Sequence, residues 1–170
     1  MGLFAVKPVT VKSGNASVLK QSSIALLEID FSATKVGAQT IDEYLQRRGS
    51  DFVRDWPQDQ ATAAHYFSKQ FNRRNSKGMR VDTDVTETAY KMVIRVKSLD
   101  MGNPAGFLFS PSSKTGGVII KGIVDIIDMR TNEIVCVLDI NRVQGEGTFA
   151  ESIRLALAFQ ELANWMCRVK

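Results

Sequence analysis

The chain offers few side chains for catalysis, and its single histidine is the first to consider. His65 is the only histidine in the sequence, so any Ser-His-Asp or Cys-His device would have to be built on it. It lies beside Tyr66 and Phe67 in a stretch with helical spacing, and no nucleophile elbow is near. We therefore expect a partly exposed helical histidine and no catalytic triad.

Three carboxylates on neighbouring predicted strands, Asp125, Asp128 and Asp139, could gather a divalent metal. A metal nuclease would place a lysine soon after the second acid, whereas Ile140 and Asn141 follow Asp139. Asp128 is also the residue type that shapes a turn. A small metal-dependent hydrolase using these carboxylates is kept as an alternative function. The sequence itself predicts no catalytic residue, no metal site and no cofactor.

A basic cluster without an acid near the end of a predicted helix is a candidate anion-binding site: Lys69, Arg73, Arg74, Lys77 and Arg80. Cations at a helix carboxyl end also stabilise the helix dipole, which is the structural interpretation. The alternative is a positive surface for anionic lipid headgroups, glycans or an acidic protein. The net charge of +4 permits an anionic partner without demanding one. A nucleic-acid-binding module is kept as a second alternative, but nucleic acid is not the expected partner because no recognition motif is present.

An apolar triplet, Phe107, Leu108 and Phe109, stands in the long connection Asp100–Gly117. Such a connection is too long and too apolar to be only a linker. Its side chains either cover the core as a lid or form a hydrophobic contact with another protein. We take the triplet as the candidate partner-binding site.

The elements in the first half of the chain are read from periodicity and caps. Period-two alternation over Ser22–Gly37 predicts a strand. The capping-box spacing of Thr40 and Glu43 begins a helix that ends at Gly49. A second helix is expected over about Asp55–Gly78, with proline in its first turn.

The second half predicts three strands and a closing helix. Alternation over Ala89–Leu99 indicates a strand, and two further strands flank the short polar turn Met129–Glu133 as a hairpin. Thr148 and Glu151 have capping-box spacing and begin a helix that runs to about Arg168. The hairpin should lie centrally in the sheet, with the closing helix across it.

The order β-α-α-β-β-β-α predicts an α+β fold: a mainly antiparallel sheet of four or five strands with helices chiefly on one face. Ile119, Ile123 and Ile127 make the second face of one strand apolar as well. A sheet covered on one side alone would not need that. We expect the amino-terminal segment or another subunit to cover this face, which predicts a homo-oligomer through the sheet face.

The amino terminus suggests export. Gly2–Ala5 is small and apolar and resembles the cleavage end of a secretory signal peptide, although the stretch can also be read as an ordinary first strand. We assign residues 1–21 to an exported amino-terminal segment, with a signal-peptide remnant and an edge strand, and residues 22–170 to a single α+β domain. Apolar runs are far shorter than the ~20 residues of a membrane helix, so no transmembrane segment is expected. Cys136 and Cys167 are either thiols or, if the last helix crosses the strand, a disulfide.

The element order, and "VDIIDMRTNEIV…GEGTFAESIRLALAFQELANWM" in particular, resembles the domain shared by TolB amino-terminal regions and several bacterial envelope lipoproteins. The matching positions are Asp128, Thr131, Glu133, Gly145 and Gly147. The resemblance implies a non-enzymatic protein–protein interaction module of the cell envelope, with an envelope protein as partner and a location in the periplasm or on the outer cell surface. The sequence has no lipobox cysteine, so a lipid anchor is not implied.

Overall fold

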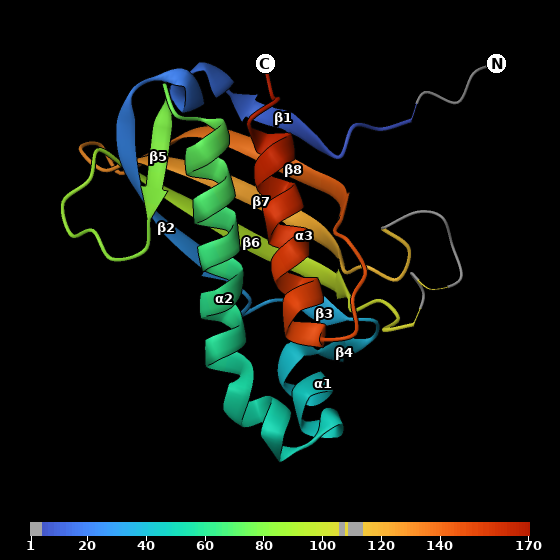
Figure 1. Cartoon of the computed structure of the whole chain (residues 1–170). Helices are drawn as coiled ribbons and strands as arrows, with labels where there is room; N and C mark the ends of the chain where they lie inside the picture. The colour runs from blue at the N-terminus through green and yellow to red at the C-terminus, as the bar shows by residue number, and fades with distance from the viewer. Residues whose placement is uncertain (1–4, 106–107, 109–113) are drawn as a thin grey trace.

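One mixed sheet carries two long helices on one of its faces (Figure 1). The computed structural model describes residues 5–105, 108 and 114–170. The elements in chain order are β1 (Val9–Gly14), the short 3-10 helix η1 (Ala16–Lys20), β2 (Ser23–Asp30), β3 (Lys35–Val36), β4 (Gln39–Thr40), α1 (Ile41–Arg48), α2 (Ser50–Arg74), β5 (Met79–Asp82), β6 (Tyr90–Asp100), β7 (Ile119–Asp128), β8 (Glu133–Gln144) and α3 (Glu151–Met166). Among the described residues, no helix is long and apolar enough to cross a membrane.

The sheet confirms the α+β class and corrects its details. It has eight strands in the order β1-β8-β7-β6-β2-β5, with β3 and β4 off this path, and not the four or five that we expected. The strands β6, β7, β8 and β1 pair antiparallel, but β2 runs parallel to both β6 and β5. The parallel pairing follows from the crossover, because α1 and α2 carry the chain back before it forms β5 and then β6. The strands β3, β4 and β5 were missed because they are too short to show a period-two pattern.

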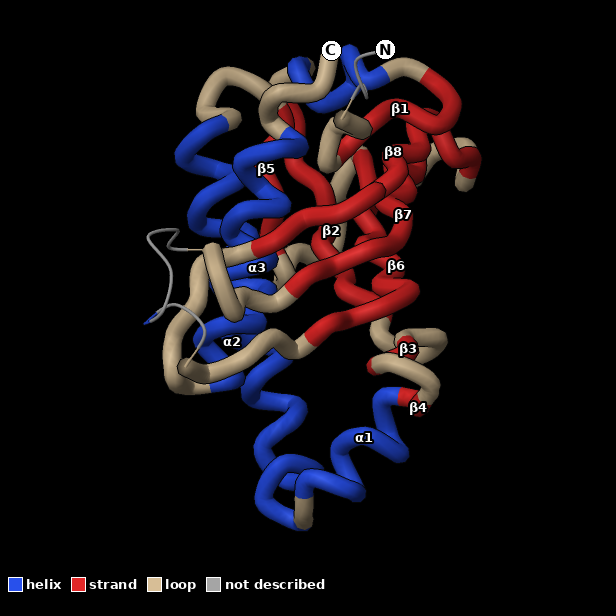
Figure 2. The backbone as a smooth tube through the Cα atoms, turned by 90° about the vertical axis from the view of Figure 1, so that its right-hand side faces the viewer, coloured by secondary structure: helices blue, strands red, loops and turns tan. Residues whose placement is uncertain are grey.

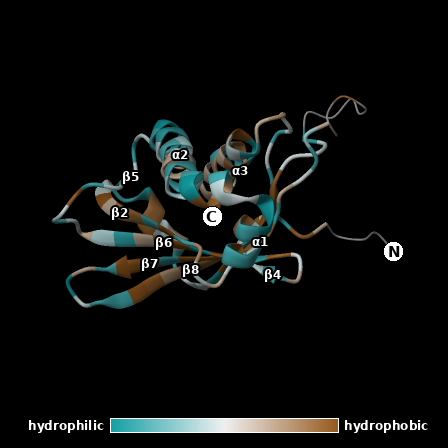
Figure 3. Cartoon of the chain, turned by 90° about the horizontal axis from the view of Figure 1, so that it is seen from below, coloured by the Kyte–Doolittle hydropathy of each residue, from teal (hydrophilic) through white to brown (hydrophobic). Residues whose placement is uncertain are grey.

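Helices α2 and α3 lie side by side on one face of the sheet, as expected, and the core fills the space between the two layers (Figures 1 and 3). Phe67 and Phe71 on α2 are fully buried and stack with their rings 5.6 Å apart. Phe159 on α3 and Met92 on β6 are also fully buried. Burying each such side chain stabilises the fold by roughly 1.5–3 kcal/mol.

Two helix starts differ in how well the sequence predicts them. The cap of α1 is confirmed, since the Glu43 backbone N–H donates to Thr40 Oγ1 at 3.2 Å. The expected start of the second helix near Asp55 is wrong, because α2 begins at Ser50 and contains Pro57 in its interior. Proline there removes the bond to the carbonyl of Val53. Val53 is 47% exposed, so water can hydrate that carbonyl.

The amino end of α3 is fixed by an arginine and not by the expected Thr148 capping box. Ala150 is the N-cap and makes no side-chain cap. The polar groups at this helix end are bound by Arg154, which is buried and only 2% exposed. Its guanidinium donates to the backbone carbonyls of Met101 at 3.2 Å, Thr148 at 2.9 Å and Phe149 at 2.8 Å. These bonds tie the loop before α3 to the connection after β6.

The second face of the sheet is not covered by the amino-terminal segment, because β1 joins the sheet at its edge beside β8 (Figure 2). Charged side chains cover its centre instead. Lys91 lies 2.6 Å from Glu28, and Arg95 contacts Asp30 at 3.2 Å and Asp125 at 2.8 Å. This explains how Asp125 can be buried on a face that bears no helix.

Candidate functional site

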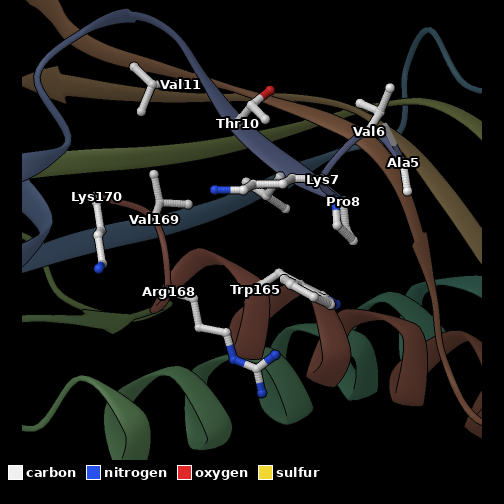
Figure 4. A pocket seen from close by; sticks show the side chains of 11 residues that line it. Ala5, Val6, Lys7, Pro8, Thr10, Val11, Trp165, Arg168, Val169 and Lys170 are labelled. Atoms are coloured by element: carbon white, nitrogen blue, oxygen red, sulfur yellow. The ribbon is translucent and has the colours of Figure 1, made fainter. Parts of the chain in front are cut away.

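A hollow of about 540 Å³ lies between residues 5–11, which lead into and include the first half of β1, and residues 165–170 at the carboxyl end of α3 (Figure 4). The two walls come from opposite ends of the sequence. They meet because β1 adds to the sheet next to β8, and α3 packs across that part of the sheet.

The strand wall is held by one residue of β8. Asn141 donates through its side-chain amide to the carbonyl of Lys7 and to Thr10 Oγ1, both at 2.9 Å. Its backbone N–H donates to the carbonyl of Pro8 at 2.8 Å. Val9 is 5% exposed and belongs to the core. The wall is therefore a fixed part of the fold.

The helix wall is the last turn of α3 and the residues after it. Lys20 donates to the carbonyl of Cys167 at 2.8 Å, which satisfies a free carbonyl at the helix end. Val169 is 8% exposed and anchors the chain after the helix. The Arg168 guanidinium lies over the Trp165 ring, 4.8 Å from its centroid. A cation over an indole face is attracted by the ring quadrupole, so each side chain orients the other.

The hollow is positively charged. Lys7, Arg168 and Lys170 line it, and no acidic side chain does. Burial raises the pKa of the neighbouring Cys167 thiol to about 11, against the opposing effect of Lys20, Arg74 and Arg168.

The side chains that line the hollow are suited to binding. Its lining contains no histidine, cysteine or carboxylate side chain. Its one hydroxyl, Thr10 Oγ1, already accepts from Asn141. The remaining surface is aliphatic or aromatic with cations at the rim, as suits an anionic ligand with apolar groups.

The predicted basic cluster is not gathered into one surface. Lys69 and Arg73 line a second hollow of about 500 Å³ on α2 and α3, where Arg73 donates to Gln70 Oε1 at 2.9 Å. Arg74 lies close enough to Cys167 to lower its pKa. Arg80 is on β5 and pairs with Ile24, which places it on the second face of the sheet. Lys77 lies in the turn between α2 and β5.

Of the predicted apolar triplet, Phe107 and Phe109 lie outside the described residues, and Leu108 is 57% exposed. The role of the triplet in partner binding stays a prediction. A further exposed aromatic side chain is Phe149 in the loop before α3, which is 62% exposed. Sequence reasoning missed this residue because it assigned the segment to a helix cap.

The three strand carboxylates do not converge. Asp125 and Asp128 are three residues apart on β7, so they project to opposite faces of the sheet. Asp125 accepts from Arg95, while Asp128 accepts from the backbone and the guanidinium of Arg130. Within the part of the chain that the structure describes, no group of three or more His, Cys, Asp or Glu side chains could hold a metal ion.

The histidine and the two cysteines lie outside the lining of the first hollow. His65 lines the second hollow beside Tyr66. Cys136 and Cys167 are free thiols, not a disulfide, and burial raises the pKa of each. The residues of the first hollow were missed by sequence reasoning. The one local signal was Trp165 followed three residues later by Arg168, which share a face of a helix.

Comparison with known proteins finds only distant structural similarity. No known family model matches the chain, and no curated protein matches it. A solved structure of the PelC dodecamer from Paraburkholderia phytofirmans is 12% identical, with a TM-score of 0.49, covering 95% of this chain and 98% of that one. A single-substitution variant of that dodecamer is also 12% identical, with a TM-score of 0.42, and the match covers 93% of this chain and 95% of the variant. Neither likeness assigns this chain to a family, and the resemblance to TolB stays a prediction.

Proposed function

We propose that this protein is a non-enzymatic protein–protein interaction module of the bacterial cell envelope, and that its partner binds at the hollow between β1 and α3. The observation that carries the proposal is the lining of that hollow. Val6, which is 74% exposed, and Val11, which is 37% exposed, line it from the strand, and Trp165 lines it from the helix with Arg168 stacked on the indole. Tryptophan and arginine are the side chains most enriched in the energetic centres of protein interfaces.

Binding accounts for this lining better than catalysis does. The neighbouring thiol belongs to Cys167, and its pKa of about 11 keeps it protonated at neutral pH. Exposed aliphatic side chains that share one hollow with an indole form an apolar surface that another molecule can cover.

The envelope location rests on the amino-terminal pattern and on the resemblance to envelope domains. We propose that the protein works in the periplasm or on the outer surface, with an envelope protein as its partner. Fractionation of the native host checks this directly. Recovery of the unprocessed protein from the cytosol would contradict it.

Self-association through the second face of the sheet is a further part of the proposal. Ile24 and Ile134 are 49% and 54% exposed, and both project to this face. A second copy would bury them. Light scattering of the wild type and of Ile134→Ser should show a concentration-dependent dimer or higher oligomer that the substitution weakens, and a monomer at all concentrations would contradict it.

The interaction function is tested by recovery and titration of the partner. Tagged wild type, Trp165→Ala and Arg168→Glu are used to recover proteins from the envelope fraction, and the recovered protein is then purified and titrated. We expect both substitutions to weaken binding at least about tenfold, which corresponds to 1.4 kcal/mol. Val53→Ser, at an exposed site on α2, is the matched control and should bind like the wild type. Equal affinity in all four proteins would place the partner elsewhere.

A further inference from the structure

We propose that the hollow takes its partner by strand addition: an extended acidic segment of another protein pairs with the free edge of β1 and sends alternate side chains against Trp165. This inference rests on the proposed function and specifies how the same site recognises its partner. It follows from the position of β1, the direction of its free backbone groups and the charge of the hollow.

The strand β1 is an edge strand. Among the described residues it pairs only with β8, on one side. Residues 11–14 of the strand are exposed. An edge strand presents unpaired N–H and C=O groups, which an extended chain can satisfy.

The register shows which groups are free. Val9 lies opposite Ile140, and the N–H of Asn141 donates to the carbonyl of Pro8. In an antiparallel pair this arrangement makes Val9 a non-hydrogen-bonded position, so its own N–H and C=O point away from β8. The same holds two residues later for Val11, before the irregularity between Val11 and Ser13. Val9 and Val11 therefore offer two donors and two acceptors at the edge.

The same register indicates that alternate side chains of an added strand would enter the hollow. Val9 and Val11 lie opposite Ile140 and Leu138, which are both buried under the helices. Because cross-strand neighbours share a face, residues of an added strand level with Val9 and Val11 would also point toward the helix layer. There they would meet Trp165 (Figure 4).

The positive charge of the hollow favours a partner segment that carries acidic residues. Lys7 and Arg168 stand on its two walls, Lys170 lines it as well, and no acidic side chain does. Arginine is suited to bind a carboxylate through two parallel hydrogen bonds. The expected ligand is an extended segment with an acidic residue at every second position, so that these carboxylates all face the hollow while the aliphatic residues between them point to the other face. An anionic membrane surface would use the same cations but would not need the strand edge.

The test uses a synthetic twelve-residue peptide of alternating valine and glutamate, labelled with a fluorophore and titrated by anisotropy. Two altered peptides accompany it: one with lysine in place of glutamate, and one N-methylated at alternate backbone amides, which removes donors to the strand edge. We expect the wild type to bind the first peptide at least about tenfold more tightly than either altered peptide.

Val11→Pro makes the same test from the protein side. The N–H of Val11 points away from β8, so proline removes a donor at the free edge without breaking the ladder, and edge strands tolerate proline. Val11→Thr keeps the N–H and is the matched control. We expect Val11→Pro to lose at least about tenfold in affinity for the peptide and Val11→Thr to keep it. If Val11→Pro does not fold, the N-methylated peptide decides the question with the wild-type protein.

The outcomes separate this inference from the proposed function. Equal affinity for the N-methylated peptide overturns strand addition. So does binding of anionic phosphatidylglycerol vesicles, in a manner that depends on Trp165, without binding of the peptide. If native-partner capture still depends on Trp165 while strand addition fails, the interaction function stands and only the mode of binding is wrong. If capture does not depend on Trp165, the proposed function itself fails.

Discussion

Replacing Arg154 with methionine should destabilise the protein strongly, because this side chain is 2% exposed and holds three backbone carbonyls. Methionine fills a similar volume and donates no hydrogen bond. Leaving a buried acceptor without its donor costs about 1–3 kcal/mol, and the loop before α3 can rehydrate in part. The carboxylate of Glu151 stays partnered, since Tyr44 donates to it at 3.1 Å and Arg48 contacts it at 3.1 Å. We therefore expect a loss of about 3–5 kcal/mol in the free energy of unfolding.

Urea denaturation followed by circular dichroism measures this loss. For a chain of this length the loss corresponds to a fall of roughly 10 °C in the melting temperature. Arg48→Met is the control, because Arg48 contacts the same Glu151 with a side chain that is 42% exposed. Exposed ion pairs contribute about 0–1 kcal/mol. If Arg154→Met and Arg48→Met cost the same, the buried guanidinium does not hold the loop and this reasoning is refuted.

Three further predictions concern the cap of α1, an aspartate and a thiol. Thr40→Ala removes the acceptor for the Glu43 N–H and should cost about 1 kcal/mol in urea denaturation, whereas an unchanged midpoint would contradict the cap. Hydrogen bonds from Ser32, with Arg95 nearby, hold the pKa of Asp30 below 3.8. This stabilisation is present above pH 3.8 and is lost as the pH falls through the folded-state pKa, so Asp30→Asn should flatten the acid limb of a stability–pH titration, and an unchanged limb would count against it. With its pKa raised from 9.0 to about 11, Cys167 should react with iodoacetamide at pH 8 about a hundredfold more slowly in the native state than in the unfolded chain, and equal rates would show an exposed thiolate.

The core was predictable because its signals are local. Alternation in β6 placed Met92 and Ile94 inward, and helical spacing placed Phe67 and Phe71 on one face of α2. These patterns arise from the fixed periods of helix and strand, so neighbouring residues carry all the information. The α+β class follows from them.

The sheet topology and the hollow depend on contacts between distant segments. The parallel pairing of β2 with β6 is set by how α1 and α2 return the chain, which no short pattern records. The hollow joins Val11 to Trp165, which lie near opposite ends of the sequence, and no local pattern records that they meet. The placement of the basic cluster depends on the fold in the same way, because residues close in sequence diverge once Arg80 enters β5 and Arg73 stays on α2.

The proposed binding site is tested most directly by photo-crosslinking in the native host. A benzophenone amino acid is placed at Val6, which is 74% exposed at the hollow, or at Val53, which is 47% exposed on α2 away from it. The account predicts a discrete crosslinked adduct with an envelope protein from position 6, lost when Trp165→Ala is added, and none from position 53. Adducts from position 53 alone, or an adduct from position 6 that persists without Trp165, would contradict the claim that the hollow is the site of interaction.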